Sequence, residues 1–435
     1  MQTPSRESSK KRMKTYFNDE RDWFFRHRFG LFIHWGLYAL DAWQEQDIWR
    51  RNRDRAEYAA LQQRFNPKHF DPEAWLDGAE AAGMSYLCFT TKHIDGFCLW
   101  DSEATDFKIT RTPYGKDVLE MIAAACQKRG FPLCLYHSIV DIHHPAYPHA
   151  GKRWEFAQSP PGDSPDKDRY LDYLNRQVEE LCTRYGKIHG FWWDGNPQRW
   201  RDPSINQRIR ELQPGIVINN RGFDEGDFGT PERDWDSAVD ERMAFEHPVE
   251  ACQSLGSQSW GYREGEDYYT DKHLIRSIAK VRAKGGNYLL NTGPGADGRI
   301  AGEDRRILGQ IGEWMCACGE ALEDVIPCSE LTANQDVVLT RRGNTLYVIL
   351  HREPVTRSVP LKPLDSLPRS AVLLNDNRAV DCHLDLLPWD HREGVPYLRI
   401  HNLPQDTLNN TVPVIRVEFD EDFARMPVGI NTEER

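Results

Sequence analysis

Short apolar runs alternate with longer amphipathic stretches from residue 29 to about residue 320, and this alternation limits the fold more than any other feature of the chain. Each run is short enough to be a buried strand. The runs are Phe29–Ile33, Tyr86–Thr90, Leu133–Tyr136, Ile188–Trp193, Ile216–Ile218 and Tyr288–Leu290. The pattern predicts strand–helix repeats around a parallel sheet.

The stretches between these runs carry the signals of helix ends. Asp71-Pro72 and Asp202-Pro203 each supply an N-cap and a first-turn proline, and Gly130 is placed to end a helix. An open doubly wound sheet would give the same alternation, but no glycine-rich phosphate loop follows the first strand. We therefore expect an α/β fold with a (β/α) barrel of TIM type.

After Cys328 the apolar residues follow a period of two, as in Leu346–Leu350 and Ile415–Phe419. This period is typical of antiparallel strands with one buried face. A length of 435 residues suits a barrel of roughly 300 residues followed by a module of about 100. We expect the barrel, with a short N-terminal tail, over residues 1–330 and a C-terminal β-sandwich over residues 331–435.

The formal net charge of −12 argues against a nucleic-acid partner, because phosphate binding needs clustered Lys and Arg that carboxylates do not oppose. No stretch reaches the roughly 18 apolar residues that span a membrane, and the N-terminus lacks the apolar core of a signal peptide. We expect no nucleic-acid or membrane partner. The chain as given reads as cytoplasmic, or as periplasmic or secreted if a leader has been removed.

The ten cysteines are scattered, and several lie in apolar runs such as YLCF and PLCLY. This distribution predicts buried thiols and no disulfide framework. Cys316-Ala-Cys318 has no second Cys/His pair at metal-binding spacing, so we predict no metal site.

Polar residues directly after the predicted strands are the candidates for a functional site, because the carboxyl ends of barrel strands meet on one rim. One strand ends in Trp192-Trp193-Asp194 and so places a carboxylate between indoles and the solvent. The other strands deliver His34, His93, Tyr136, His137 and Arg221. Such groups, without a phosphate loop or a cofactor motif, suit a neutral ligand rich in hydroxyl groups. Aromatic walls around a sugar would also explain the high count of 14 Trp.

Seven motifs together resemble the α-L-fucosidases of glycoside hydrolase family 29 over about residues 25–320. They are FGLFIHWGLY (29–38), TTKHIDGFCLWDS (90–102), FWWDG (191–195), INNR (218–221), GTPER (229–233), SWGYR (259–263) and GGNYLLNTGPGADG (285–298). The resemblance implies a (β/α) barrel before a β-sandwich. It also implies hydrolysis of a terminal α-L-sugar, from an oligosaccharide or a small α-L-glycoside, with retained anomeric configuration and no cofactor.

The resemblance places the nucleophile on Asp194 and the acid/base on Glu250, where the family's Trp-Glu pair reads Val249-Glu250. Two such carboxyl groups lie roughly 5–5.5 Å apart in retaining enzymes. The other nearby carboxylates, interpreted as solvated loop charges, are Glu232, Asp236, Glu246 and Glu264. The positions that match sugar contacts are His34, Trp49, His93, Trp192 and Arg221, with Tyr136 or His137 lining the same pocket.

Two positions depart from the family pattern. Ile94 stands where the family has a second His, and Ile48 stands where it has a Glu before Trp49, although Asp47 or Glu45 could take that role. Isoleucines would leave sugar hydroxyls unpaired, at roughly 1–3 kcal/mol each. We therefore keep α-L-glucosidase and α-L-galactosidase activity as alternatives to α-L-fucosidase activity.

A non-catalytic sugar-binding protein is a more distant alternative, because binding alone does not require a carboxylate such as Asp194 on the rim. The sequence also leaves open whether the chain forms a homo-oligomer.

Overall fold

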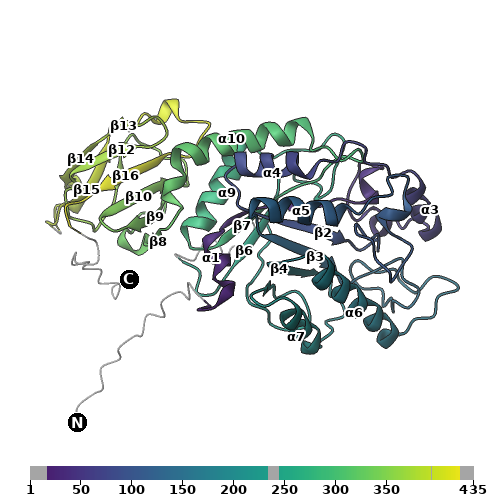
Figure 1. Cartoon of the computed structure of the whole chain (residues 1–435). Coiled ribbons are helices and arrows are strands. Elements are labelled where there is room, and N and C mark those ends of the chain that lie inside the picture. Colours follow the sequence, from purple (N-terminus) through teal and green to yellow (C-terminus); the bar gives the residue numbers. More distant parts are fainter. Residues whose placement is uncertain (1–16, 234–243, 393, 422–435) are drawn as a thin grey trace, which may run out of the picture.

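The computed structural model describes residues 17–233, 244–392 and 394–421. Seven parallel strands form the first sheet, in the order β5-β4-β3-β2-β1-β7-β6 (Figure 1). They are β1 (Phe29–Ile33), β2 (Tyr86–Lys92), β3 (Leu133–Ser138), β4 (Gly190–Asp194), β5 (Val217–Ile218), β6 (Glu250–Ser254) and β7 (Asn287–Thr292). Six of them coincide with predicted runs. The seventh, β6, reads EACQS and carries no apolar run.

The two edge strands β5 and β6 are linked by the segment 227–233. Parallel bridges join Asn219 to Phe228 and Gly229 to Val249, and a third joins Glu232 to Cys252. The sheet is therefore completed into a barrel by an irregular segment in place of a regular strand.

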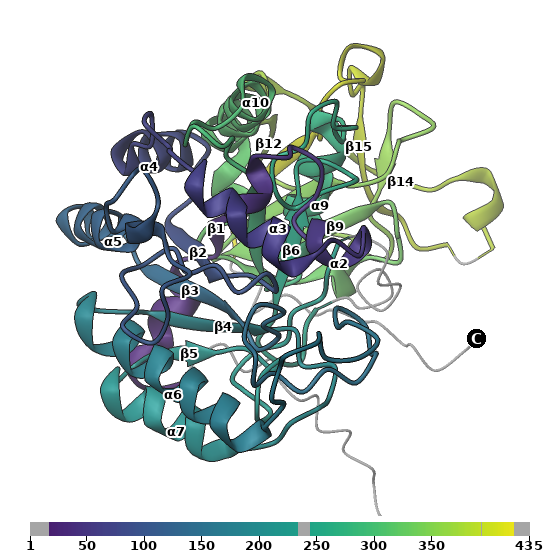
Figure 2. The same ribbon diagram turned by 90° about the vertical axis from the view of Figure 1, so that its right-hand side faces the viewer.

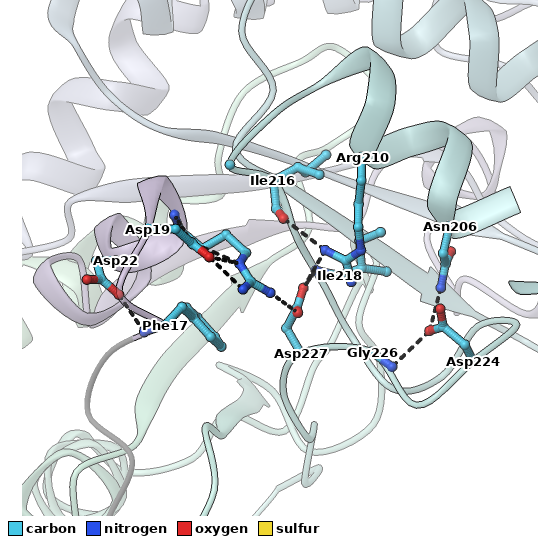
Figure 3. A network of polar contacts seen from close by, with 12 residues as sticks. Phe17, Asp19, Asp22, Asn206, Arg210, Ile216, Ile218, Asp224, Gly226 and Asp227 are labelled. Atoms are coloured by element: carbon cyan, nitrogen blue, oxygen red, sulfur yellow. Dashed lines mark hydrogen bonds and ion pairs between the residues drawn. The ribbon is translucent and has the colours of Figure 1, made fainter. Parts of the chain in front are cut away.

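Figure 3 shows how this segment is anchored beside β5. The Asp227 carboxylate accepts hydrogen bonds from Arg21 (2.7 Å), Arg210 (2.9 Å) and the backbone N–H of Ile218 (2.8 Å). Asp224 accepts from the side chain of Asn206 at 2.6 Å. These carboxylates fix the chain on the C-terminal side of the loop that carries Arg221.

Helices α4 to α7 lie along the outer side of β1 to β5 (Figure 2). Asp71 and Asp202 cap α4 and α7, each followed by a first-turn proline, and Gly130 ends α5 with a φ of 66°. The helices are α1 (Trp23–Arg26), α2 (Asp47–Arg50), α3 (Arg55–Ala59), α4 (Pro72–Ala81), α5 (Val118–Arg129), α6 (Lys167–Arg184), α7 (Pro203–Leu212), α9 (Asp271–Ala283) and α10 (Gly302–Cys318). Short 3-10 turns are η1 (Glu20–Asp22), η2 (Leu37–Ala39), η3 (Ala60–Gln63), η4 (Ile109–Arg111), η5 (Gly319–Ala321), η6 (Ser329–Leu331), η7 (Pro388–Asp390) and η8 (Gln405–Thr407).

Residues along each strand alternate between the barrel interior and the helices, as the pleat requires. Tyr136 and Trp192 share an interior cluster with Phe32, whereas Trp193 donates from its indole to Asn206 on α7 at 2.8 Å. All ten cysteines are free, and eight of them are buried.

The C-terminal part consists of two antiparallel sheets, with strand orders β13-β12-β16-β10-β9-β8 and β11-β15-β14. The strands are β8 (Ile326–Pro327), β9 (Val337–Arg342), β10 (Thr345–Leu350), β11 (Val359–Pro360), β12 (Ser370–Leu373), β13 (Arg378–Ala379), β14 (Asp381–Asp385), β15 (Tyr397–His401) and β16 (Val414–Glu418). Leu339 and Val348 pack in one core with Leu398 and Ile400 of the smaller sheet. The predicted fold class, a (β/α) barrel followed by an antiparallel β-sandwich, is confirmed.

The opposite face of the larger sheet packs against the barrel helices (Figure 1). Tyr347 and Ile349 belong to the same hydrophobic cluster as the barrel helices, and the Trp314 indole on α10 donates to the Val412 carbonyl at 2.9 Å. Within the described ranges, no helix is long and apolar enough to cross a membrane.

Candidate active site

A cavity of about 380 Å³ opens at the carboxyl ends of the barrel strands. Strands supply part of its lining, and the loops after β1, β3, β5 and β6 supply most of the rest. The residues that line it are Phe32, His34, Gln44, Glu45, Gln46, Arg50, His93, Tyr136, Arg153, Trp154, Trp192, Asp194, Arg221, Glu232, Arg233, Cys252, Ser257, Gln258 and Trp260. Six of the predicted site residues therefore meet in one cavity: His34, His93, Tyr136, Trp192, Asp194 and Arg221.

Asp194 is the last residue of β4, and 22% of its side chain is exposed. Its Oδ2 accepts a hydrogen bond from the Tyr136 hydroxyl at 2.9 Å, and its Oδ1 accepts one from Arg221 Nη1 at 3.2 Å. Burial by itself would raise the pKa of Asp194, but Arg221, Tyr136 and His93 together lower it. The group is therefore an ionised carboxylate at neutral pH, as a nucleophile must be.

Arg221 connects Asp194 to a second carboxylate of the cavity. Its Nη2 lies 3.3 Å from Oε2 of Glu232, while its guanidinium lies 4.7 Å from the centre of the Trp192 ring. Glu232 belongs to the segment that completes the barrel, and 45% of its side chain is exposed. Two carboxyl groups therefore flank one guanidinium at the mouth of the cavity.

The two histidines of the cavity are neutral. Burial, together with the neighbouring His93, lowers the pKa of His34 to about 3, and burial also lowers the pKa of His93. The Nδ1 of His34 lies 2.7 Å from Oδ1 of Asn291, and the His93 ring stacks on Tyr136 with an interplanar angle of 13°. Neutral imidazoles at fixed orientations are suited to hydrogen bonds with hydroxyl groups.

Glu45 also lines the cavity, and its carboxylate is held on both sides. Oε1 accepts from Gln44 at 2.6 Å, and Oε2 accepts from the Ser259 hydroxyl at 3.1 Å and the Trp260 backbone at 2.9 Å. Of the two carboxylates that the sequence left open for the family's missing Glu, Glu45 lies in the cavity. The other, Asp47, is fully buried and forms an ion pair with Arg53.

Glu250 does not line the cavity. It is the first residue of β6, at the opposite end of the barrel from the cavity, and is 3% exposed. Tyr86 donates to its Oε2 at 2.5 Å, and the Trp192 indole donates to its Oε1 at 2.9 Å. Burial raises the pKa of Glu250 to about 7. The carboxyl group thus supports the floor of the cavity from below Trp192.

His137 and Trp49 do not line the cavity either. His137 follows Tyr136 on the same strand, so its side chain lies on the opposite face, where its Nδ1 is 2.9 Å from the Thr91 hydroxyl. The Trp49 indole instead donates to the backbone carbonyl of Glu155 at 3.0 Å.

The two isoleucines that depart from the family pattern lie in the hydrophobic core. Ile48 is 1% exposed and Ile94 is 2% exposed, and neither lines the cavity. The expectation that they face the sugar's hydroxyls is therefore not supported by the structure.

Among the other carboxylates considered from the sequence, Glu246 and Glu264 are exposed and do not line the cavity, and Asp236 lies outside the described residues. Trp260, which sequence reasoning did not single out, lies within the SWGYR motif, and its ring centre is 5.4 Å from that of His34. No sequence motif of this kind marks the other cavity residues Arg50, Arg153 and Trp154. No group of three or more His, Cys, Asp or Glu in the described part of the chain is arranged to hold a metal ion.

The α-L-fucosidase family model matches residues 2–320 of the chain. The tissue α-L-fucosidase of Bos taurus is 27% identical over 360 residues, which cover 76% of this chain and 75% of the relative. Among solved structures, α-L-fucosidase isoenzyme 1 from Paenibacillus thiaminolyticus is 34% identical, with a TM-score of 0.80 over 92% of this chain and 99% of that one. A family 29 α-L-fucosidase from Bacteroides thetaiotaomicron, trapped as a covalent intermediate with 2-fluoro-fucosyl fluoride, is 25% identical with a TM-score of 0.77 and covers 92% of this chain and 96% of that one.

Proposed function

Because this chain belongs to the α-L-fucosidase family of glycoside hydrolases, we propose that it hydrolyses terminal α-L-fucosides with retention of configuration, using Asp194 as its nucleophile. The observation that carries the proposal is the position of Asp194 at the end of β4, between Tyr136 and Arg221 in the cavity. The covalent intermediate of the Bacteroides relative supports a mechanism in two displacements.

In the first displacement a carboxylate oxygen of Asp194 attacks C1 of the sugar, the bond from C1 to the leaving oxygen breaks, and that oxygen takes a proton from an acid. In the second displacement, the conjugate base of that acid takes a proton from water. The water oxygen attacks C1, and the bond from C1 to Asp194 breaks. Arg221 and the Tyr136 hydroxyl orient the Asp194 carboxylate for the attack.

We assign the acid/base role to Glu232 in this proposal. Its carboxylate lines the cavity, and the contacts of Arg221 with both Asp194 and Glu232 bring the two carboxyl groups close enough to act on one glycosidic bond. Glu45 also lines the cavity, but backbone and side-chain donors already hold it. Glu250, the residue favoured from the sequence, has both oxygens occupied by Tyr86 and Trp192 away from the cavity.

We propose fucose as the sugar, because the chain belongs to the α-L-fucosidase family. Glu45, His34 and His93 provide polar groups, and the neighbouring rings of Phe32 and Trp260 provide apolar surfaces against which a methyl group and a sugar face can pack. The alternatives of L-glucose and L-galactose depended on Ile48 and Ile94, which lie in the core.

A panel of 4-nitrophenyl α-L-glycosides tests this proposal. We expect kcat/KM for the fucoside to exceed that for the glucoside and the galactoside, and proton NMR in the first minutes should show the α anomer of the released sugar. Initial release of the β anomer would rule out the double displacement, and preferred cleavage of another glycoside would rule out fucose.

A further inference from the structure

Two arginines on the rim of the cavity have no acidic partner in the portions of the chain that the structure describes. Arg50 ends α2 and Arg153 lies in the loop between β3 and α6, and both side chains are exposed and line the cavity. Nearby arginines are paired: Arg51 with Asp47, and Arg55 with Asp163. In a chain with a net charge of −12, two uncompensated guanidiniums at the entrance to a site form a local positive field.

Each of these guanidiniums lies against the indole that neighbours it in sequence. The carbon of the Arg153 guanidinium is 4.6 Å from the centre of the Trp154 ring, and that of Arg50 is 5.5 Å from the centre of the Trp49 ring. Contacts of this kind limit the orientations of an otherwise mobile side chain while its N–H groups stay free to bind.

The loop that presents Arg153 is rigidly held. The buried carboxylate of Glu155 accepts hydrogen bonds from Tyr147 (2.7 Å), Gln198 (2.8 Å) and the backbone of Ala150 (2.9 Å). The Trp49 indole donates to the Glu155 carbonyl at 3.0 Å and so joins the segment of Arg50 to the loop of Arg153.

Trp154 itself has two features of a binding residue. Its φ is 70°, in the left-handed region that residues other than glycine rarely adopt, and its buried indole nitrogen has no hydrogen-bond partner among the described residues. A strained backbone at a residue that lines a cavity is typical of functional sites.

We propose that the outer part of the cavity binds a sugar leaving group that carries a carboxylate or a sulfate, held by Arg50 and Arg153 beside the Trp154 ring. The inference rests on the proposed function, since the fucosyl group must occupy the inner part next to Asp194. A guanidinium matches the planar carboxylate and the sulfate oxygens through paired N–H donors, and an indole packs on the apolar face of the leaving sugar.

Three disaccharides that share the α-L-fucosyl group test the inference: fucosyl-galactose, fucosyl-galacturonate and fucosyl-(6-sulfo)galactose. We expect kcat/KM to be about tenfold higher for the acidic substrates than for the neutral one, which is the size of one or two solvent-exposed charged contacts. The preference should shrink as salt is added. The relative rates on the two acidic substrates distinguish the carboxylate from the sulfate.

The variant R50A/R153A should bring kcat/KM for the acidic and neutral disaccharides to within about twofold of each other, because it lowers kcat/KM for the acidic substrates more than for the neutral one. Lys152→Ala is the matched control, because it removes an adjacent exposed cation that does not line the cavity, and the preference should persist. Equal kcat/KM for all three disaccharides in the wild type would overturn the inference, and so would a preference for acidic substrates that is unchanged in R50A/R153A. Hydrolysis of the aryl fucoside by the wild type would still support the proposed function in either case. Failure to cleave any fucoside would overturn both.

Discussion

Asp194 and Glu250 are carboxyl groups within the same barrel, yet their environments shift their pKa values in opposite directions. Asp194 ends β4 in the cavity, where Arg221 lowers its pKa, whereas Glu250 begins β6 beneath Trp192, where burial raises its pKa to about 7. The comparison shows that two carboxyl groups that point into the same barrel can differ in whether they line the cavity. The level of each group along the barrel axis decides whether a ligand can reach it.

The largest effect should come from Asp194→Ala. Without the nucleophile the covalent step is lost, so kcat on 4-nitrophenyl α-L-fucoside should fall by about a thousandfold or more. Added azide should restore part of the activity from the vacated space. An unchanged thermal unfolding curve would serve as the folding control, and retention of more than about a tenth of the kcat would mean that another residue is the nucleophile.

Glu232→Ala and Glu250→Gln should distinguish a residue that acts as the acid/base from a residue that supports the floor of the cavity. Glu232→Ala should slow a disaccharide by about a hundredfold or more, but an activated aryl fucoside far less, because only the poor leaving group needs a proton. Glu250→Gln should change both substrates by a similar and smaller factor, since it acts through Trp192. The reverse pattern would return the acid/base role to Glu250.

Glu250 should also leave a signature in the pH dependence of stability. Its folded pKa of about 7 lies above its ordinary value of 4.5, so the folded state binds this proton more tightly than the unfolded state does. Its contribution to the free energy of unfolding should be full below about pH 4.5 and should disappear as the pH rises through about 7. Denaturant titrations of wild type and Glu250→Gln should diverge over this window, and parallel curves would contradict the shift.

The smallest effect should come from Ile94→Val. Because Ile94 is a core residue, the change should cost about 1 kcal/mol of stability and leave the ratio of kcat/KM for fucoside over glucoside within about twofold. A large change in that ratio at constant stability would place Ile94 in contact with the sugar after all.

The sequence was most informative where an apolar run led directly into a polar residue. His34 and Asp194 could be placed on the rim because Phe29–Ile33 and the run ending in Trp193 mark their strands clearly. Glu250 was harder to place because β6 reads EACQS, so neither the strand nor its starting residue could be recognised. Glu250 is the first residue of β6, and this position puts its side chain at the end of the barrel away from the cavity.

The positions of loop residues were harder to predict from the sequence. The choice between Glu45 and Asp47 depends on how an irregular segment turns, and no periodic pattern reports this. Arg153 and Trp154 reach the rim through a loop whose shape is set by the buried carboxylate of Glu155. Such hydrogen bonds cannot be anticipated from one chain's residue order.

The irregular segment 227–233 has a consequence for protein engineering. Asp194 lies on a regular strand whose register is fixed by both neighbours, whereas Glu232 lies on a connector joined to β6 through isolated bridges. A connector of this kind tolerates changes of length that a strand does not. Thr230 must be kept, because its hydroxyl and carbonyl accept hydrogen bonds from Arg221 at 2.6 and 2.9 Å, but libraries that vary residues 231–233 could explore new positions for a proton donor.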